Sequence, residues 1–328
     1  MRLISLCALL AVSILFATKA NAGIACSASG TMQFGIFNVL TGTASSVQPA
    51  SISVSCSGAS PNATSATVCV SLGSGQSTQW PPREMINGTN KLRFEIYKDA
   101  ALTTIMGAWP AQVTPYTAGT TGLTLQIPLS NGSGGTSFTL YGVILSAQQS
   151  VPAGTYTNVF ADTSSSLDYF QNINQQTIPT CDTTTGAVKS KTLSFTASAT
   201  VDQNCSISAS NLNFGTINSF LTNVDASSAV NITCSATLPY TVSLSGGLTN
   251  ATDPTQRKMK SSSNDLLTYG LFRDAARTQP WGNTTSINTV AGIGTANAQT
   301  LNVYGRVYSG QSVLPGTFSD TVSATVTY

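Results

Sequence analysis

The chain of 328 residues contains no histidine, and only 8% of its residues carry a charge. Without histidine, the Ser-His-Asp and Cys-His arrangements of hydrolases are excluded, as is every histidine-ligated metal site. Glu84 and Glu95 are the only glutamates, so a glycosidase with paired carboxylates would depend mainly on aspartates. We therefore expect a protein that is not an enzyme, with no catalytic residue, no cofactor and no metal.

Apolar runs long enough for a membrane helix are also missing, and the one sizeable run lies at the start of the chain. Arg2 precedes the apolar residues 3–17, and Ala20-Asn21-Ala22 follows as a small-x-small cleavage site. This order is typical of a secretory signal peptide, and the run is shorter than the ~20 apolar residues of a spanning helix. We predict that residues 1–22 are removed during export.

Charge of either sign is scarce and balanced. Removal of residues 1–22 takes away Arg2 and Lys19, which leaves 12 basic residues against 12 acidic ones. A nucleic-acid partner requires many lysines and arginines to neutralise its phosphates. The balance of charge therefore excludes nucleic acid as a partner.

One pattern of residues is present twice. Cys26, Phe34-Gly35 and Cys56 recur as Cys205, Phe214-Gly215 and Cys234 at almost the same spacing. Further paired segments follow in the same order: residues 92–100 and 266–275, Trp109 and Trp281, Tyr141-Gly142 and Tyr304-Gly305, and residues 152–156 and 315–318. A repeat this long indicates two copies of one domain rather than a solenoid. We place copy one at residues 23–201 and copy two at residues 202–328.

Six cysteines remain after the signal peptide is removed, an even number in an oxidising compartment, so disulfides are expected. The repeat makes Cys26–Cys56 and Cys205–Cys234 equivalent pairs. This leaves Cys69–Cys181 as a bridge that only copy one has. A loop of about 30 residues closed by a disulfide contributes roughly 3.5 kcal/mol in the chain-entropy model.

Apolar residues alternate with serine and threonine along most of the chain, as in Ser51-Ile52-Ser53-Val54-Ser55-Cys56. Alternation with period two and β-branched residues predicts half-buried strands, and no segment has a helical period. Clusters of Gly, Ser and Asn between these segments predict turns. The fold class we predict is all-β, with two immunoglobulin-like antiparallel β-sandwich domains.

Copy two has six clear strand patterns, near residues 205–214, 229–234, 240–245, 266–272, 300–308 and 317–328. Copy one has counterparts of all six and a further alternating segment, with apolar residues at Leu193, Phe195, Ala197, Ala199 and Val201. An immunoglobulin-like sandwich needs seven or more strands. We predict that copy two lacks its final strand and accepts one from another chain, because an open edge would otherwise aggregate.

Only Gly23-Ile24-Ala25 separates the predicted cleavage site from Cys26. If subunits of this type donate the strand that precedes their first cysteine, this chain has no strand to give. We expect a protein that can accept a strand but cannot donate one, which places it at the end of a linear fibre.

The organisation resembles the spore coat protein U-like domain, the building block of archaic chaperone–usher pili, once in each copy. The motifs that carry the resemblance are the Cys…Phe-Gly…Cys opening, residues 269–277 (Tyr-Gly-Leu-Phe-Arg-Asp-Ala-Ala-Arg) and the closing segment 315–328. Copy one departs from the pattern, because Leu102 stands where the motif has arginine and residues 158–190 form an insertion.

Two-domain proteins of this family resemble the tip adhesin of such pili. The resemblance implies an N-terminal domain that binds a surface or receptor, in attachment and biofilm formation, and a C-terminal pilin domain. It also implies a periplasmic chaperone, an outer-membrane usher and an adjacent pilin as partners, and a location at the tip of a pilus on the cell surface. Val322, Ala324, Val326 and Tyr328 would form one wall of the groove that takes the donor strand.

Large apolar residues that only copy one has are the candidates for binding a ligand, because exposed apolar loop tips mark interaction sites. They are Leu167, Tyr169 and Phe170 in the insertion, Trp80, Pro81 and Pro82, and Ile105 and Met106. The alternative is that these segments fold back over the sandwich as a satellite core. We expect Trp109 and Trp281 to be core residues, and Asp99 and Asp274 to cap a turn that both copies share.

Two other functions fit the same sequence. One is a structural or assembly subunit of the same pilus without an adhesive role. The other is a secreted glycan-binding β-sandwich protein, in which Trp80 and Tyr169 stack on a sugar and neighbouring asparagines donate hydrogen bonds.

Overall fold

The computed structural model describes residues 23–77, 80–109, 120–173, 181, 189–191 and 193–328. The predicted signal peptide lies outside these residues. The described chain is almost entirely β structure, with two short 3-10 helices, η1 (Val39–Thr41) and η2 (Asp162–Ser164). No helix among the described residues is long and apolar enough to cross a membrane.

The strands fall into two groups that follow the two copies. Copy one contains β1 (Ala25–Phe37), β2 (Gln48–Ser57), β3 (Ala63–Leu72), β4 (Arg83–Asn87), β5 (Asn90–Tyr97), β6 (Leu123–Pro128), β7 (Gly134–Ile144), β8 (Gly154–Phe160), β9 (Ser165–Ile173), β10 (Lys189–Lys191) and β11 (Ser194–Val201). Copy two contains β12 (Cys205–Ala209), β13 (Val224–Cys234), β14 (Pro239–Leu244), β15 (Arg257–Lys260), β16 (Leu266–Phe272), β17 (Val290–Ile293), β18 (Gln299–Val307) and β19 (Ala324–Thr327). Among the described residues, each sheet contains strands of one group only. The division between residues 201 and 202 as a domain boundary stays a prediction.

In copy one, seven strands close on themselves in the order β1-β11-β8-β4-β5-β7-β2, and a four-stranded sheet has the order β10-β9-β3-β6. Closure depends on β1, which changes partner along its length. Residues 25–30 pair with β2, and residues 29–37 pair in parallel with β11. The other side of β11 is antiparallel to β8. The parallel β1–β11 pair was not predicted.

Copy two has two open sheets, one with the order β12-β13-β18-β16-β15 and one with the order β17-β14-β19. The strands β15 and β17 have four residues each and were not among the six predicted for this copy. Their apolar alternation is too short to stand out in the sequence. The sheets pack around a core that includes Val230, Val242, Trp281 and Val307.

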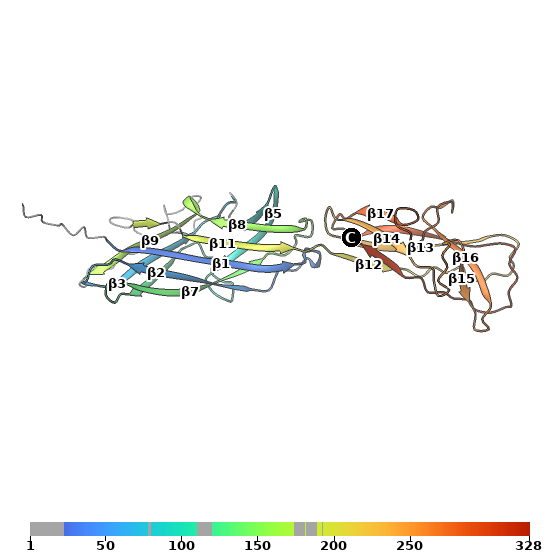
Figure 1. Ribbon diagram of the computed structural model, residues 1–328, viewed down its shortest axis with the longest axis horizontal. Helices are drawn as coiled ribbons and strands as arrows, with labels where there is room; N and C mark the ends of the chain where they lie inside the picture. Colours follow the sequence, from blue (N-terminus) through green and yellow to red (C-terminus); the bar gives the residue numbers. More distant parts are fainter. Residues whose placement is uncertain (1–22, 78–79, 110–119, 174–180, 182–188, 192) are drawn as a thin grey trace, which may run out of the picture.

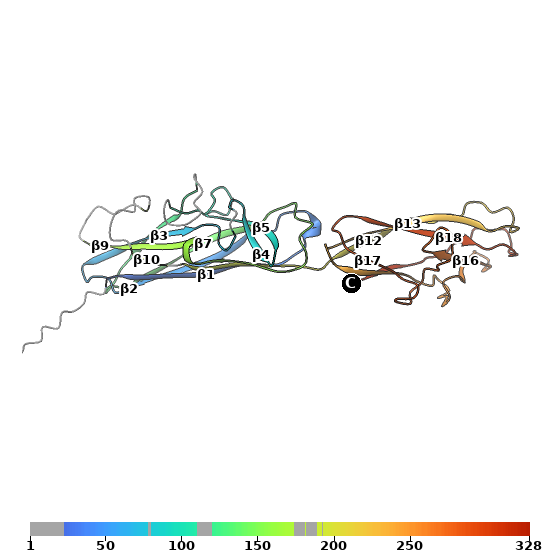
Figure 2. The ribbon, with the colours of Figure 1, turned by 90° about the horizontal axis from the view of Figure 1, so that it is seen from above.

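The two copies lie end to end in an elongated molecule (Figure 1). The linker 202–204 joins β11 to β12, and the C-terminus lies at the end of copy two that faces copy one (Figures 1 and 2). The strands β3 and β9 are near the opposite end of copy one (Figure 1). This arrangement gives the molecule one end made of copy one alone and one end made of copy two alone.

All three predicted disulfides are present. Cys26–Cys56 and Cys205–Cys234 each join the first strand of a copy to its neighbour, with Cα atoms 4.0 Å apart. Cys69–Cys181 links β3 to a residue that follows β9, across a separation of 112 residues. The repeat was therefore a correct guide to the pairing, because equivalent cysteines occupy equivalent ladder positions.

Candidate functional site

The strand β11 fills the core of copy one. Its inward-facing residues alternate with exposed or half-buried serine and threonine, and each of them is at most 3% exposed. They are Leu193, Phe195, Ala197, Ala199 and Val201. Because β11 lies between β1 and β8, both of those strands are paired along their length. The extra alternating segment that the sequence showed in copy one is thus the strand that completes it.

The same position in copy two is open. Here β12 pairs only with β13, and β19 pairs only with β14, among the strands of the described residues. Residues 210–217, the counterpart of the second half of β1, have no regular structure, and the same is true of most of residues 316–323, the counterpart of β8. Extended segments need a partner for their N–H and C=O groups, so these two stay irregular where the strand between them is missing.

A groove runs between these two irregular segments. It consists of two adjoining cavities of about 550 and 690 Å³, which share Leu212, Phe214, Met259 and Phe318 in their walls. The first cavity extends to Val322 and Ala324, and the second extends to Phe220, Leu267 and Leu314. Its walls combine large apolar side chains with polar groups, and its length along two unpaired segments suits an extended peptide that pairs with both.

The burial of equivalent residues shows what the missing strand changes. Met32 and Phe34 of copy one are 0% and 7% exposed, whereas their counterparts Leu212 and Phe214 are half-buried. The two pairs are equivalent because each packs against the same glycine of the repeat. A Cβ atom added at Gly142 would overlap Met32 and Phe34, and a Cβ atom added at Gly305 would come close to Leu212 and Phe214. The core of copy two is therefore complete in sequence but open on one side.

The four residues predicted to form one wall of the groove are placed differently from one another. Val322 and Ala324 line the first cavity. Val326 packs against the core of copy two, outside the lining of both cavities. Tyr328 is 53% exposed and follows the last residue of β19, so it is not part of that wall.

A polar group lies in the floor of the groove. The Tyr269 hydroxyl donates to Asp320 Oδ2 at 2.6 Å, and both residues line the first cavity. Burial, followed by the bond to Asp320, raises the pKa of Tyr269 well above its usual value. The nearby Arg257 is fully buried, and this burial lowers its pKa, while the carboxylate charges of Asp320 and Asp253 oppose the shift.

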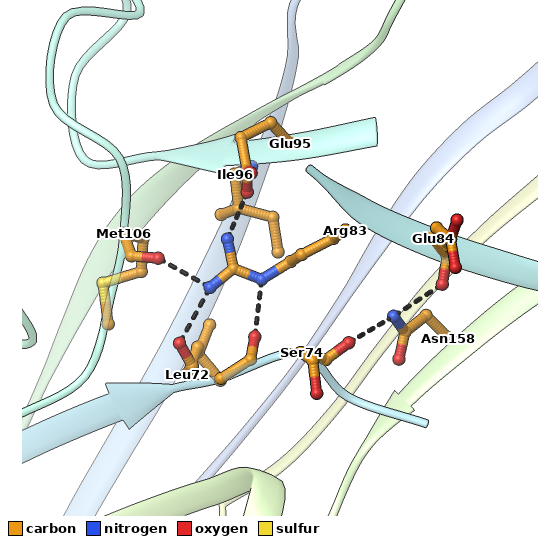
Figure 3. A network of polar contacts seen from close by, with 9 residues as sticks. Leu72, Ser74, Arg83, Glu84, Glu95, Ile96, Met106 and Asn158 are labelled. Atoms are coloured by element: carbon orange, nitrogen blue, oxygen red, sulfur yellow. Dashed lines mark hydrogen bonds and ion pairs between the residues drawn. The ribbon is translucent and has the colours of Figure 1, made fainter. Parts of the chain in front are cut away.

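Each copy also contains a buried arginine, which the sequence analysis missed. Arg83 donates to the carbonyl oxygens of Gly73, Leu72 and Met106 and forms an ion pair with Glu95 (Figure 3). Arg257 donates to the carbonyls of Ser245, Leu244, Trp281 and Pro254. A sequence pattern could have identified the two arginines as equivalent, because Arg83-Glu84-Met85 and Arg257-Lys258-Met259 share the pattern Arg-x-Met. These arginines join loops to strands and are inaccessible to a ligand.

Most residues predicted to bind a ligand are buried, so they are not the exposed loop tips that the prediction assumed. Leu167, Tyr169 and Phe170 belong to β9, which pairs with the central strand β3, and they are 0%, 1% and 8% exposed. The part of the insertion that forms β9 therefore folds back over the sandwich, the second of the two alternatives that the sequence left open. It does so because β9 alternates in the register that buries Leu167 and Tyr169 in the main core.

The other candidates are placed as follows. Met106 is 0% exposed, and Trp80 is 9% exposed, with the Arg83 guanidinium 4.5 Å from its ring centroid. Pro82 and Ile105 are half-buried, and Pro81 is exposed. Of this set, only Pro81 is exposed, Pro82 and Ile105 are partly accessible, and the others are buried.

The predicted pairing of Trp109 with Trp281 in the repeat is corrected by the structure. Trp281 is a core residue, as predicted, but its counterpart is Met106 instead of Trp109. The N–H groups of Met106 and Trp281 donate to Ile96 and Leu271, and their carbonyls accept from the two buried arginines. Trp109 instead packs against the cluster of Cys69, Phe170 and Cys181.

Asp99 and Asp274 cap the same turn in the two copies, which confirms their structural role. Asp99 accepts hydrogen bonds from the N–H groups of Thr103 and Thr104. Asp274 accepts them from Thr278 and Gln279. These bonds lower the pKa of Asp99, and those to Asp274 outweigh desolvation and lower its pKa as well.

Known proteins match the chain in both copies. The family model described as the Spore Coat Protein U domain matches residues 11–163 and 191–325. "Protein U" of Myxococcus xanthus is 33% identical over 128 residues, which cover 36% of this chain and 71% of that protein.

Two solved structures align with most of the chain, and the first of them has a similar fold. One comes from the complex of CsuC with the tip adhesion subunit CsuE, from the archaic chaperone-usher Csu pili of Acinetobacter baumannii; it covers 93% of this chain and 100% of that chain, with a TM-score of 0.52 and 21% identity. The other is the CupB6 tip adhesin from Pseudomonas aeruginosa, with a TM-score of 0.35, 12% identity and 93% of each chain covered. From the family match over both copies and the relative in Myxococcus, the chain belongs to the Spore Coat Protein U domain family.

Proposed function

We propose that this protein is the tip adhesin of an archaic chaperone–usher pilus, which attaches the cell to a surface and supports biofilm formation. Copy one is the binding domain, and copy two anchors the protein by accepting a strand from the next subunit. The observation that carries the proposal is the asymmetry of the copies. Copy one is closed by its own strand β11, and copy two has an open groove at the equivalent position.

The direction of the groove supports a place at the tip. β12 begins directly after the linker and runs into copy two (Figure 1). If a donor strand binds in the groove of copy two as β11 does in copy one, it runs parallel to β12 and antiparallel to residues 316–323. Its C-terminal end would leave copy two at the end remote from copy one. The subunit that donates the strand would follow there, and copy one would stay free.

The same groove fits the other partners that we propose. A periplasmic chaperone would cover it with a strand before assembly, because an apolar groove exposed in the periplasm favours aggregation. At the outer-membrane usher, the N-terminal strand of the adjacent pilin would replace the chaperone. The protein would thus pass through the periplasm to the cell surface.

Immunogold labelling with an antibody against copy one tests the position of the protein. We expect gold at the ends of pili, in cells that make the whole assembly system. Label distributed along the shaft would contradict the tip assignment and favour a structural subunit without an adhesive role.

A groove variant tests the anchoring step. Val322→Asp with Ala324→Asp places two carboxylates in the wall of the groove, so we expect label and adhesion to disappear while the mutant protein is still exported. The matched control, Ser323→Asp with Thr325→Asp, changes the exposed residues of the same segment. Normal labelling of the groove variant would show that copy two is not held by a strand in this groove.

A glycan-binding role is not favoured by the positions of the residues once considered for it. Trp80 and Tyr169 are 9% and 1% exposed, so neither ring offers a face on which a sugar could stack.

A further inference from the structure

The floor of the groove differs from the equivalent place in copy one in two side chains, and the first of them is a carboxylate. Asn158 on β8 and Asp320 in copy two are equivalent, because each accepts a hydrogen bond from the backbone N–H of the residue that follows a turn glycine. Asn158 Oδ1 accepts from Gln76 at 2.9 Å, and Asp320 Oδ1 accepts from Leu248 at 2.7 Å. Glycines with φ of +71° and +73°, Gly75 and Gly247, let each side chain approach its turn. A neutral amide in the closed copy thus corresponds to a carboxylate in the open copy.

A second substitution accompanies the first. Tyr269 pairs with Arg257 in the β15–β16 ladder, and Phe94 pairs with Arg83 in the β4–β5 ladder, so the two aromatic residues are equivalent. The Tyr269 hydroxyl donates to Asp320, whereas Phe94 has no hydroxyl. Asn158 instead donates to the carbonyls of Ser74 and Glu84 (Figure 3). The carboxylate and the hydroxyl therefore occur together, in the copy whose groove is open.

The strand β11 shows which residue of a bound strand meets this place. Ala197 lies opposite Asn158 on one side and opposite Met32 on the other. Its inward neighbours are Phe195, opposite Phe160, and Ala199, opposite Tyr156. A strand bound in the same register in copy two would place its central inward residue beside Asp320 and Leu212, above Tyr269.

We propose that Asp320 and Tyr269 select the strand that copy two accepts. The partner is an extended segment of another protein whose central inward residue is small, or carries a hydroxyl, with large apolar residues on its N-terminal side. This is the order of β11, from Leu193 and Phe195 to Ala197 and Ala199. The proposal rests on the proposed function of the groove and names the kind of strand that fills it.

The physical reason is the cost of covering a carboxylate. With the groove empty, Asp320 is half-buried and water reaches it. A large apolar side chain above it would remove that water and return no hydrogen bond, which is unfavourable for an ionised group. A small residue leaves room for a water molecule, and a serine or threonine hydroxyl donates directly. Asp320 accepts from the Leu248 and Thr321 N–H groups and from Tyr269, and it keeps its charge. Copy one avoids the problem because Asn158, under its permanent strand, is neutral and bonds to Gln76, Ser74 and Glu84.

Synthetic peptides with the sequence of residues 191–201 test the selection against the whole mature chain. The parent peptide and two variants are compared by fluorescence anisotropy: A197L changes the central inward residue, and T200L changes an exposed one. We expect the parent and T200L to bind alike and A197L to bind about tenfold or more weakly, because a larger residue is forced onto the carboxylate. Equal binding of A197L and the parent would overturn the selection.

Protein variants assign the selection to the carboxylate. In D320A, and in D320N, which keeps an acceptor for the Leu248 N–H, we expect the ratio of parent to A197L affinity to fall severalfold. D265A removes a carboxylate outside the groove and should leave the ratio unchanged. The ratio compares two peptides on one protein, so a general loss of stability does not alter it. An unchanged ratio in both Asp320 variants would overturn the role of Asp320, and a failure of every peptide to bind would contradict the open groove itself.

Discussion

Two buried arginines perform the same structural task with different charge partners. The side chains of Arg83 and Arg257 are both 0% exposed and donate to the carbonyls of Leu72 and Leu244 respectively. Arg83 also has Glu95 as a buried counter-ion. The equivalent of Glu95 in copy two is Gly270, so Arg257 depends on carbonyl oxygens and on the more distant charge of Asp320.

The Arg83–Glu95 pair leads to a prediction about stability. Arg83→Met leaves the Glu95 carboxylate buried without its partner, so we expect a loss of about 3–5 kcal/mol in the unfolding free energy of copy one. Adding Glu95→Gln to this variant removes the charge and should restore part of the loss. Chemical denaturation of the two variants measures the difference, and a double variant that is less stable than Arg83→Met would contradict the prediction.

Two equivalent glycines offer a comparison of the closed and open cores. A methyl group at Gly142 overlaps Met32 and Phe34, which β11 holds in place, so we expect Gly142→Ala to cost about 1–3 kcal/mol. Gly305→Ala meets Leu212 and Phe214, which can move into the open groove, and should cost less. Thermal unfolding of each variant gives the order. The reverse order would show that the second core is as tightly held as the first.

At the scale of elements, one strand accounts for most of the difference between the copies. The second half of β1 and the whole of β8 are regular because β11 pairs with both. Their counterparts, residues 210–217 and 316–323, carry similar residues and yet are largely irregular. Local alternation makes a strand possible, and pairing with a neighbour makes it stable.

The contribution of β11 can be measured at Phe195, which is 1% exposed with its ring 5.5 Å from that of Phe160. We expect Phe195→Ala to lower the stability of copy one by about 3–5 kcal/mol, because it leaves a large cavity in the core. Thr200→Ala on the exposed face of the same strand should have little effect. Equal stability of the Phe195 variant and the wild type would mean that β11 does not hold copy one closed.

Elements were predicted well where the alternation was long and poorly where it was short. The segments around β2, β7, β11 and β18 have clear alternation and were predicted as strands. The four-residue strands β15 and β17 were missed, and for β9 the sequence left open whether the segment projects as a loop or folds back over the sandwich. In β9, serine, aspartate and asparagine stand among large apolar residues, a composition that local reasoning reads as exposed. Its place beside the central strand β3 depends on a ladder between residues about 100 positions apart.

At the scale of the whole molecule, the disulfides divide between the two copies. Cys69–Cys181 closes a loop of 112 residues within copy one and lies beside Phe170 and Trp109. Copy two has one bridge, Cys205–Cys234, between neighbouring strands. The copy that we propose to meet a surface is therefore the more heavily cross-linked one.

Removal of the long-range bridge should separate the two copies in an unfolding experiment. Cys69→Ser with Cys181→Ser is expected to lower the stability of copy one by roughly 4–5 kcal/mol in the chain-entropy model. The transition of copy two should stay where it is, because the bridge lies outside it. Differential scanning calorimetry detects both transitions, and a shift of the copy-two transition would contradict the independence of the two copies.

The sequence by itself determined the duplication, the three disulfide pairs, the all-β class and the strand that copy two lacks, because each depends on spacing or alternation that repeats along the chain. Only the tertiary structure decided which apolar residues are accessible, since Leu167 and Tyr169 are buried by strands far away in sequence. It also decided which groups Arg83 and Tyr269 bond to. A buried polar group is stable only with the partners that folding brings to it. Arg83 is far from Met106 along the chain, and Tyr269 is far from Asp320.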